Sequence, residues 1–221
     1  MKVFVIGGGA AGMMAAITSA KYGNDVTLVE KTSDVGNKIK ITGKGRCNLT
    51  FFGDVDDFKK NIVKNYKFMY SSFNNFSNKD VINYFEEIGV KTKVERGNRV
   101  FPVSDNAFDV VSALKKELKK YNVKVIYNTK LNDLIVKDGV LSGIVLSNGK
   151  VGKCDKCIIA TGGTSYKNTG SSGDCYAIAK NVGHNVIDIL PGLVPLRSND
   201  DICKKLQGLS LKNIEFRLQY E

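Results

Sequence analysis

The chain has 221 residues, of which 43% are hydrophobic and 25% charged, with 22 glycines and 3 prolines. These fractions exclude collagen-like, low-complexity and strongly disordered classes. The length supports one large domain or two smaller ones. No apolar run reaches the roughly 20 residues that span a bilayer, and Gly7, Gly8 and Gly9 interrupt the N-terminal apolar run before it resembles a signal peptide. We expect a soluble, cytoplasmic protein with no membrane partner.

The net charge of +11 is unevenly built, because 28 Lys stand against 5 Arg. Arg is the preferred residue for recognising phosphates and base edges, so a Lys-rich chain is a weak candidate for specific nucleic-acid recognition. The Lys residues are scattered, apart from a group on one predicted helix: Lys115, Lys116, Lys119 and Lys120. We interpret the charge as a solvated surface and do not expect a nucleic-acid partner.

The five cysteines predict reduced thiols, because their odd number argues against a disulfide framework. Cys154 and Cys157 form a single C-x-x-C pair within a predicted strand. A thioredoxin-like centre needs such a pair at the start of a helix, and a zinc site needs a second pair. We therefore predict no metal site.

The N-terminal elements predict a βαβ unit. Residues 2–6 and 26–29 are short apolar runs typical of buried parallel strands. Residues 10–22 between them read as a helix, which Gly23 ends. This arrangement is typical of an α/β fold with a parallel sheet.

The middle of the chain is irregular and then mainly helical. The segment 32–50 lacks periodicity and is rich in Gly and Lys, so we expect a loop that has room for one helical turn. Residues 54–88 predict two or three helices, the last with Asn78 as its N-cap. Residues 90–101 are predicted to be extended.

The clearest helix is predicted over 104–121, with Ser104 as its N-cap. Its apolar face carries four side chains, those of Phe108, Val111, Leu114 and Leu118. A further strand is predicted over 123–126. A helix over 174–182 and a strand-like segment over 211–220 come last.

A three-stranded antiparallel meander is predicted before that last helix. Its extended runs cover 130–137, 140–146 and 151–160. The turns between them contain Asp138-Gly139 and Asn148-Gly149, and these are the strongest short hairpin signals.

The segment Gly7-Gly8-Gly9-Ala10-Ala11-Gly12 fits the dinucleotide-binding pattern G-x-G-x-x-G, directly after a strand and at the start of a helix. Gly7 permits the tight turn, Gly9 lets the backbone approach a pyrophosphate, and Gly12 allows close packing of helix on strand. Glu30 ends the second strand, where an acid accepts hydrogen bonds from ribose hydroxyls. Either NAD or FAD fits this pattern. The meander favours FAD by analogy of architecture.

Several further segments resemble one family of bacterial flavoproteins, the BaiN-like or aminoacetone oxidase family of NAD(P)/FAD-dependent oxidoreductases. The matching segments are the stretch from Glu30-Lys31 through Thr42-Gly43-Lys44-Gly45-Arg46-Cys47-Asn48-Leu49-Thr50, residues 95–104, Ala160-Thr161-Gly162-Gly163, Gly170-Ser171-Ser172-Gly173-Asp174 and residues 191–196. They occur in the family's order and extend over nearly the whole chain.

The resemblance implies a glutathione-reductase-like, Rossmann-type FAD-binding domain with a β-rich domain inserted after the Pro195 region. We expect the FAD-binding domain to cover 1–190, with its helical segment at 54–88. The segment 191–221 is then the incomplete start of the inserted domain. In the family the chain returns to the FAD domain with a C-terminal segment, so we expect this chain to be truncated.

The resemblance and the fingerprint together give a set of expected cofactor-binding residues. Leu131 is expected to contact adenine through its backbone, and Arg46 to place positive charge near the flavin or its phosphates. The whole set is Gly7, Gly9, Ala10, Ala11, Gly12, Glu30, Lys31, Lys38, Thr42, Gly45, Arg46, Cys47, Asn48, Leu131, Thr161, Gly162, Gly163 and Asp174.

For two of these residues, a purely structural role is the alternative to a role in the cofactor site. Asp174 is either a helix N-cap or a cofactor ligand, and Cys47 is either a small buried residue or a redox-active thiol beside the flavin. No residue is a clear acid or base, so Arg46, Cys47 and Asn48 are only candidates for catalysis.

The expected function is that of an FAD-dependent oxidoreductase, which passes a hydride from NAD(P)H through the flavin to a small organic acceptor or oxygen. One alternative is a nucleic-acid-associated flavoprotein that serves RNA modification, motivated by the net charge. Another is an inactive nucleotide-binding fragment. The oligomeric state stays open.

Overall fold

The computed structural model describes residues 1–192, 199–209, 214, 215 and 217. The chain divides into two compact units, Met1–Val186 and Ile187–Glu221. The second unit contains α8 (Asp201–Lys205), and the strand predicted over 211–220 falls mostly outside the described residues. The predicted boundary at residue 190 stays a prediction. No helix in the described part is long and apolar enough to cross a bilayer.

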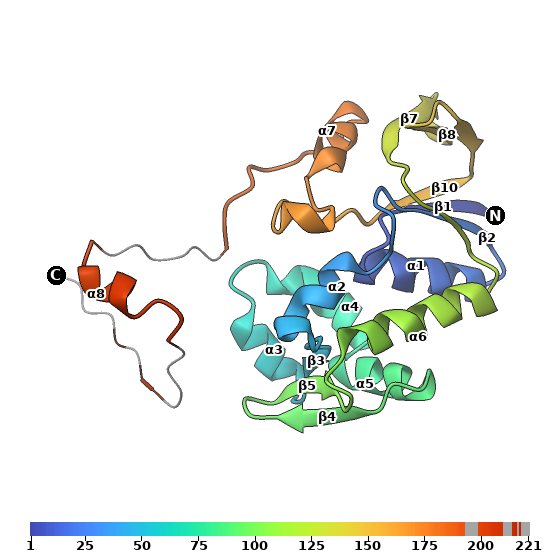
Figure 1. Cartoon of the computed structure of the whole chain (residues 1–221). Helices are drawn as coiled ribbons and strands as arrows, with labels where there is room; N and C mark the ends of the chain where they lie inside the picture. The colour runs from blue at the N-terminus through green and yellow to red at the C-terminus, as the bar shows by residue number, and fades with distance from the viewer. Residues whose placement is uncertain (193–198, 210–213, 216, 218–221) are drawn as a thin grey trace. The chain divides into compact units, whose positions relative to one another are not determined.

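The first unit is built on a four-stranded parallel sheet in the order β10-β1-β2-β6 (Figure 1). Its strands are β1 (Lys2–Ile6), β2 (Asp25–Val29), β6 (Lys124–Ile126) and β10 (Lys156–Ile159). The predicted βαβ unit is confirmed, because α1 (Ala10–Lys21) connects the paired strands β1 and β2.

Both faces of this sheet are covered, because the side chains of β1 alternate between them. Val3 and Val5 belong to one core, together with apolar residues of α1 and of α6 (Ala107–Lys120). Phe4 and Ile6 belong to a second core with the antiparallel meander. Figure 1 shows α1 and α6 along one face of the sheet and the meander on the other. The sheet is therefore the middle of three layers.

The predicted meander is confirmed as β7 (Leu131–Lys137), β8 (Val140–Leu146) and β9 (Val151–Lys153), each antiparallel to the next. At the first turn Asp138 and Gly139 have φ of 51° and 75°. Positive φ at both central positions suits the twist of a two-residue hairpin and explains the Asp-Gly pair.

The prediction of a single strand over 151–160 is wrong. The run is divided into β9 in the meander and β10 in the parallel sheet. Asp155 lies at the break, where its carboxylate Oδ2 accepts from the Lys2 backbone N–H at 2.7 Å and its own N–H donates to the Lys2 carbonyl. The second half of the run therefore pairs with the edge of β1. Because the two segments are far apart in the sequence, local periodicity does not predict this pairing.

The helical segment predicted over 54–88 is confirmed as α3 (Val55–Asn61), the 3-10 turn η2 (Tyr66–Met69), α4 (Tyr70–Asn75) and α5 (Asn78–Glu87). A small antiparallel sheet lies beside it, in the order β3-β5-β4. Its strands are β3 (Thr50–Phe51), β4 (Thr92–Glu95) and β5 (Arg99–Pro102). Within the loop predicted over 32–50 the structure has α2 (Asn37–Ile41) and the 3-10 turn η1 (Thr42–Gly45).

Both predicted N-caps are wrong. Ser77 caps α5 in a reciprocal pair with Asp80, and the Asn78 amide donates instead to the Phe51 and Gly53 carbonyls at 2.8 and 2.7 Å. Asn106, rather than Ser104, caps α6. These polar residues lie one or two positions apart, and short-range hydrogen bonds decide between them: Ser77 forms a capping box with Asp80, and the Asn106 side chain accepts from the Phe108 N–H.

The apolar face predicted for α6 is correct except at its first member. Val111, Leu114 and Leu118 are buried, but Phe108 is 59% exposed. Val110 takes its place in the core because it precedes Leu114 by one helical turn. After β10 the chain continues through η3 (Lys167–Thr169) to α7 (Asp174–Asn181).

Asp34 connects the loop after β2 to two helices. Its carboxylate pairs with Lys40 on α2 at 2.8 Å and with Lys115 on α6 at 2.5 Å. Burial raises the pKa of this carboxyl, but hydrogen bonds from Lys115, Lys40 and the Val35 N–H outweigh burial and lower the pKa to about 2. Asp34 therefore contributes stability while it is ionised.

We expect Asp34→Asn to lower the free energy of unfolding at neutral pH by about 1 kcal/mol, a figure reduced for the partial exposure of the carboxyl. Because the folded pKa lies below the unfolded value, the wild-type advantage is present above about pH 4 and is lost as the pH falls towards about 2. Urea denaturation across this range measures it, with Asp138→Asn as the matched control. A difference that does not change with pH would contradict the assignment.

Candidate functional site

A cavity of about 360 Å³ lies where the carboxyl ends of β1, β2 and β10 meet. The chain leaves β1 towards β2 on one side, and β10 pairs with β1 on the other. Parallel α/β sheets bind ligands at this kind of switch in strand order. The cavity is lined by residues 6–11, 30–31, 36–39, 42, 129–131, 160–162 and 169–175.

The glycines of the fingerprint have separate roles in this geometry. Gly7 has φ +102°, and a Cβ there would lie 2.7 Å from the Ala160 carbonyl oxygen. A Cβ on Gly12 would lie only 1.7 Å from the Gly7 carbonyl oxygen. A Cβ on Gly9 would meet nothing within 4 Å, and Gly9 lines the cavity. Two glycines thus close the strand–helix contact, and the third leaves room for a ligand.

The N-terminus of α1 opens into the cavity. Its N-cap is Gly9, no side chain caps it, and no acidic residue lies in its first turn. Ala10 and Ala11 of that first turn line the cavity. Uncapped backbone N–H groups and the positive end of the helix dipole make such a terminus suitable for a phosphate group.

Glu30 is buried at the end of β2 and holds the fingerprint loop from the other side. Its Oε2 accepts from the Gly8 N–H at 2.6 Å, and its Oε1 accepts from the Thr32 N–H and hydroxyl at 2.8 and 2.7 Å. A carboxylate offers about four acceptor positions, so a further position remains for a hydroxyl from a ligand in the cavity.

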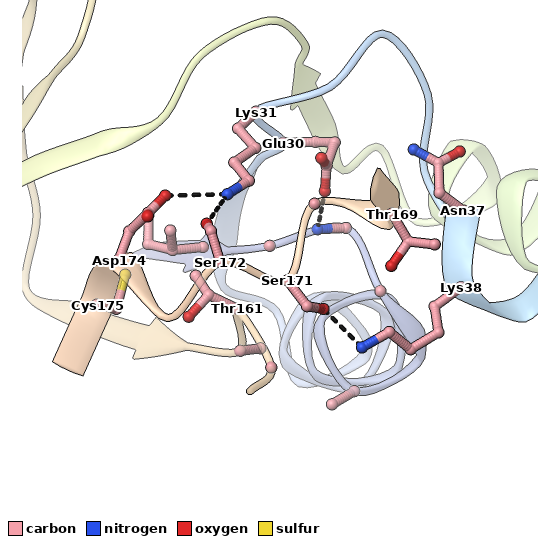
Figure 2. A pocket seen from close by; sticks show the side chains of 18 of the residues that line it. Glu30, Lys31, Asn37, Lys38, Thr161, Thr169, Ser171, Ser172, Asp174 and Cys175 are labelled. Atoms are coloured by element: carbon pink, nitrogen blue, oxygen red, sulfur yellow. Dashed lines mark hydrogen bonds and ion pairs between the residues drawn. The ribbon is translucent and has the colours of Figure 1, made fainter. Parts of the chain in front are cut away.

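Two lysines join the β2–α2 side of the cavity to the segment 165–174 (Figure 2). Lys31 pairs with Asp174 at 2.9 Å and also donates to the Ser172 hydroxyl. Lys38 donates to the Ser171 hydroxyl at 2.7 Å and to the Ser165 carbonyl at 3.0 Å. The hydrogen bond from Lys31, followed by that of Ser172, lowers the pKa of Asp174. Asp174 is the first residue of α7, whose N-cap is Gly173, so its side chain serves the cavity wall.

The structure brings most of the predicted site residues together at this cavity. Its lining includes Gly7, Gly9, Ala10, Ala11, Glu30, Lys31, Lys38, Thr42, Leu131, Thr161, Gly162 and Asp174. Gly12 lies behind the wall in the helix–strand contact. The remaining predicted residues lie outside the lining: Gly45, Arg46, Cys47, Asn48 and Gly163.

Sequence reasoning missed several polar residues of the wall. Ser171 and Ser172 receive the two lysine side chains, and Asn37 and Thr129 also line the cavity. The two serines could have been predicted from the sequence, because they belong to the same segment as Asp174, Gly170-Ser171-Ser172-Gly173-Asp174. Asn37 and Thr129 gave no signal of their own.

A second cavity, of about 750 Å³, adjoins the first and shares Lys38 and Thr42 with it. Part of the loop 42–50, including Arg46, lines this second cavity. The whole lining is Lys38, Ile41, Thr42, Gly43, Lys44, Arg46, Arg99, Phe101 and Tyr166. A ligand that extends beyond Thr42 therefore enters a cationic environment.

Arg46 is already engaged within the small sheet. Its Nη1 donates to both carboxylate oxygens of Glu95, at 2.9 and 3.0 Å, and pairs with Asp105 at 3.3 Å. Its guanidinium lies 4.0 Å from the centre of the Phe101 ring. The hydrogen bond to Glu95 raises the pKa of Arg46. The expected contact of Arg46 with a flavin stays a prediction.

Cys47 and Asn48 brace the same loop. Cys47 is buried with φ +63°, and burial raises the pKa of its thiol. A thiol of raised pKa is protonated at neutral pH and is a poor nucleophile. The Asn48 amide nitrogen, in the orientation that satisfies both of its ends, donates to the Val100 and Thr50 carbonyls at 3.1 and 3.0 Å. Their predicted catalytic roles stay predictions.

The C-x-x-C pair belongs to the packed interior rather than to a reactive centre. Cys154 is buried between β9 and β10. Burial, followed by the nearby Cys154 and Cys175, raises the pKa of Cys157 to about 12. Among the described residues no group of His, Cys, Asp or Glu side chains is arranged to hold a metal ion.

The first cavity fits the adenine dinucleotide part of FAD. The uncapped N-terminus of α1 suits a pyrophosphate, the open space at Gly9 lets it approach, and Glu30 keeps an acceptor position for a ribose hydroxyl. These three features lie along one cavity that ends at Lys38 and Thr42, where the second cavity begins.

Comparison with known proteins gives consistent matches over nearly the whole chain. The family described as "HI0933-like protein Rossmann domain" matches residues 1–218. A "3-dehydro-bile acid delta(4,6)-reductase" of Clostridium scindens is 32% identical over 94% of this chain and 50% of its own length. A "ribosomal RNA dihydrouridine synthase" of Haemophilus influenzae is 30% identical over 94% of this chain and 52% of its own length.

A solved flavocytochrome c3 fumarate reductase has the same fold, with a TM-score of 0.59 and 20% identity over 83% of this chain and 40% of that one. The chain spans about half the length of the curated relatives named above. The predicted fold class is confirmed. The chain belongs to the HI0933-like family and has its Rossmann-type, FAD-binding α/β fold.

Proposed function

We propose that this chain binds FAD in the first cavity and that the whole protein is an NAD(P)H-dependent flavin oxidoreductase acting on a small organic acceptor or oxygen. The observation that carries the proposal is the joint geometry of Gly9, the uncapped N-terminus of α1 and the buried Glu30. Membership of the BaiN-like or aminoacetone oxidase branch is part of the same proposal, supported by the segment Gly45-Arg46-Cys47-Asn48.

Each part of the cavity has a role towards the cofactor. The first-turn N–H groups of α1 bind the pyrophosphate, and Glu30 accepts from the ribose. Leu131, buried at the start of β7, offers its backbone to the adenine. Thr161 and Gly162, after β10, form the wall next to the fingerprint turn. When bound, FAD would supply the chemistry of hydride transfer between NAD(P)H and the acceptor.

Lys31 and Lys38 belong to the wall of the first cavity. Lys31 is neutralised by Asp174, whereas Lys38, within the described part of the chain, meets only uncharged oxygens. Its positive charge is therefore available near the junction of the two cavities. A fixed cation at this place stabilises negative charge on a phosphate or on a reduced ring system.

A second candidate is a flavoprotein that acts on RNA. It is favoured by the net charge of +11 and by the similarity to proteins named ribosomal RNA dihydrouridine synthases in Haemophilus influenzae and Escherichia coli. An RNA oligonucleotide would then bind with an affinity that falls steeply as the salt concentration rises. The small-molecule proposal expects weak RNA binding and turnover of a small acceptor.

The carboxylate of Glu30 gives a direct test of the cofactor assignment. We expect Glu30→Gln to weaken FAD binding about tenfold, because a charge-assisted hydrogen bond to the ribose becomes a neutral one. Titration of FAD fluorescence measures the affinity. Glu87→Gln, at an exposed position of α5, is the matched control and should bind FAD as the wild type does. Equal FAD affinity of both variants would remove Glu30 from the cofactor site.

A substitution at Gly9 tests FAD binding separately from folding. A Cβ at Gly9 meets nothing within 4 Å, and its φ of −78° suits any residue. We expect Gly9→Val to lower the free energy of unfolding of the FAD-free chain by at most about 1 kcal/mol, the cost of a less favourable N-cap residue, while FAD binding falls more than about tenfold by exclusion of the pyrophosphate. Urea denaturation and FAD titration of one preparation measure both. Unchanged FAD affinity would place the cofactor elsewhere.

A further inference from the structure

The second cavity has an excess of positive charge. Lys38, Lys44, Arg46 and Arg99 line it, and no carboxylate is among its lining residues in the described part of the chain. Its volume of about 750 Å³ falls in the range of small-molecule sites, roughly 300–1,000 Å³. The ligand that suits it therefore depends on which of these cations are already neutralised.

Arg46 is neutralised within a network of two cations and two anions. Glu95 and Asp105 each pair with both Arg46 and Lys93. The bond from Arg46 to Glu95 and the bond from Lys93 to Asp105 lower the pKa of these two carboxyls. The two positive and two negative charges of this network cancel. The Arg46 guanidinium is packed on the Phe101 ring. Arg46 thus forms a fixed part of the wall.

Within the residues that the structure describes, Arg99 and Lys44 are not neutralised. The Arg99 Nε donates to the Arg96 carbonyl at 3.1 Å, which orients the guanidinium 5.9 Å from the centre of the Phe101 ring. Among the described residues, no carboxylate pairs with Arg99, Lys44 or Lys38, whose ammonium group meets only uncharged oxygens. Arg99 and Lys44 are both exposed.

Apolar and aromatic surface completes the cavity. Ile41 is 47% exposed and Tyr166 is 71% exposed, and both line it beside Phe101. Guanidinium groups near an aromatic ring keep their planar faces stacked and their outer N–H groups free for an oxoanion. The lining therefore suits a molecule with an apolar or conjugated body and a negatively charged end.

We propose that the second cavity binds the carboxylate or phosphate end of a small organic acceptor, with Arg99 and Lys44 as the anion-binding groups. This inference rests on the proposed function and names the substrate class of that oxidoreductase. Because Lys38 and Thr42 belong to both cavities, a ligand held here lies next to the cofactor site. Two oxygens of one carboxylate or phosphate match the fork of the Arg99 guanidinium.

The test is isothermal titration of the full chain, supplied with FAD, in a phosphate-free buffer. The probes are trans-cinnamate, phenyl phosphate and the neutral trans-cinnamamide. We expect one of the two anions to bind, which identifies carboxylate or phosphate as the preferred group, and the amide to bind about tenfold more weakly or not at all. Arg99→Gln and Lys44→Gln should each weaken the bound anion about tenfold. Lys153→Gln, an exposed cation on β9, is the matched control and should leave binding unchanged.

Several results would overturn the inference. They are failure of both anions to bind, equal affinity for cinnamamide, or unchanged anion affinity in Arg99→Gln. Tight binding of an RNA oligonucleotide that Arg99→Gln abolishes, without binding of the small anions, would assign the cavity to RNA instead. Retention of FAD is measured on the same sample. FAD retention without anion binding contradicts this inference alone, whereas anion binding without FAD retention contradicts the proposed function and leaves the anion site standing.

Discussion

The contact between Gly7 and Gly12 is the constraint on which the site depends. Because a Cβ on Gly12 would lie 1.7 Å from the Gly7 carbonyl oxygen, only glycine lets α1 start this close to the end of β1. The close start directs the uncapped helix terminus at the cavity beyond the carboxyl ends of β1, β2 and β10. Glu30 then fixes the loop by accepting from the Gly8 N–H. A larger residue at position 12 would move the helix, the loop and the cavity together.

The rest of the first unit supports that contact from both faces of the sheet. Helices α1 and α6 fill one face and the meander the other, so the carboxyl ends of the strands are left to the ligand-binding loops. Asp34 joins the loop after β2 to α2 and α6, and Lys31 and Lys38 join it to the segment 165–174. The cavity wall is thus assembled from parts of the chain that are far apart in sequence, held by charge-assisted hydrogen bonds.

Local patterns predicted the elements whose signals are local. The βαβ unit, the hairpin turns at Asp138-Gly139 and Asn148-Gly149 and the helical segment 54–88 depend on short-range periodicity and turn chemistry, and all are confirmed. The division of the run 151–160 depends on its long-range pairing with β1. The N-caps Ser77 and Asn106 are instead local features, the first in a capping box with Asp80, and the choice of Asn78 and Ser104 overlooked them. In the site, the fingerprint and Glu30 were visible in the sequence. The partners of Arg46, which lie in β4 and after β5, were not.

The assignment of the first cavity to FAD is tested by the absorption spectrum of the purified chain after incubation with FAD and removal of free flavin, followed by anaerobic addition of NADH or NADPH. We expect a protein-bound flavin spectrum that bleaches with one of the two nicotinamides. A colourless protein that retains no flavin would contradict the assignment of the first cavity to FAD. A flavin spectrum that neither nicotinamide bleaches would contradict the proposed electron donor while leaving the cofactor site in place.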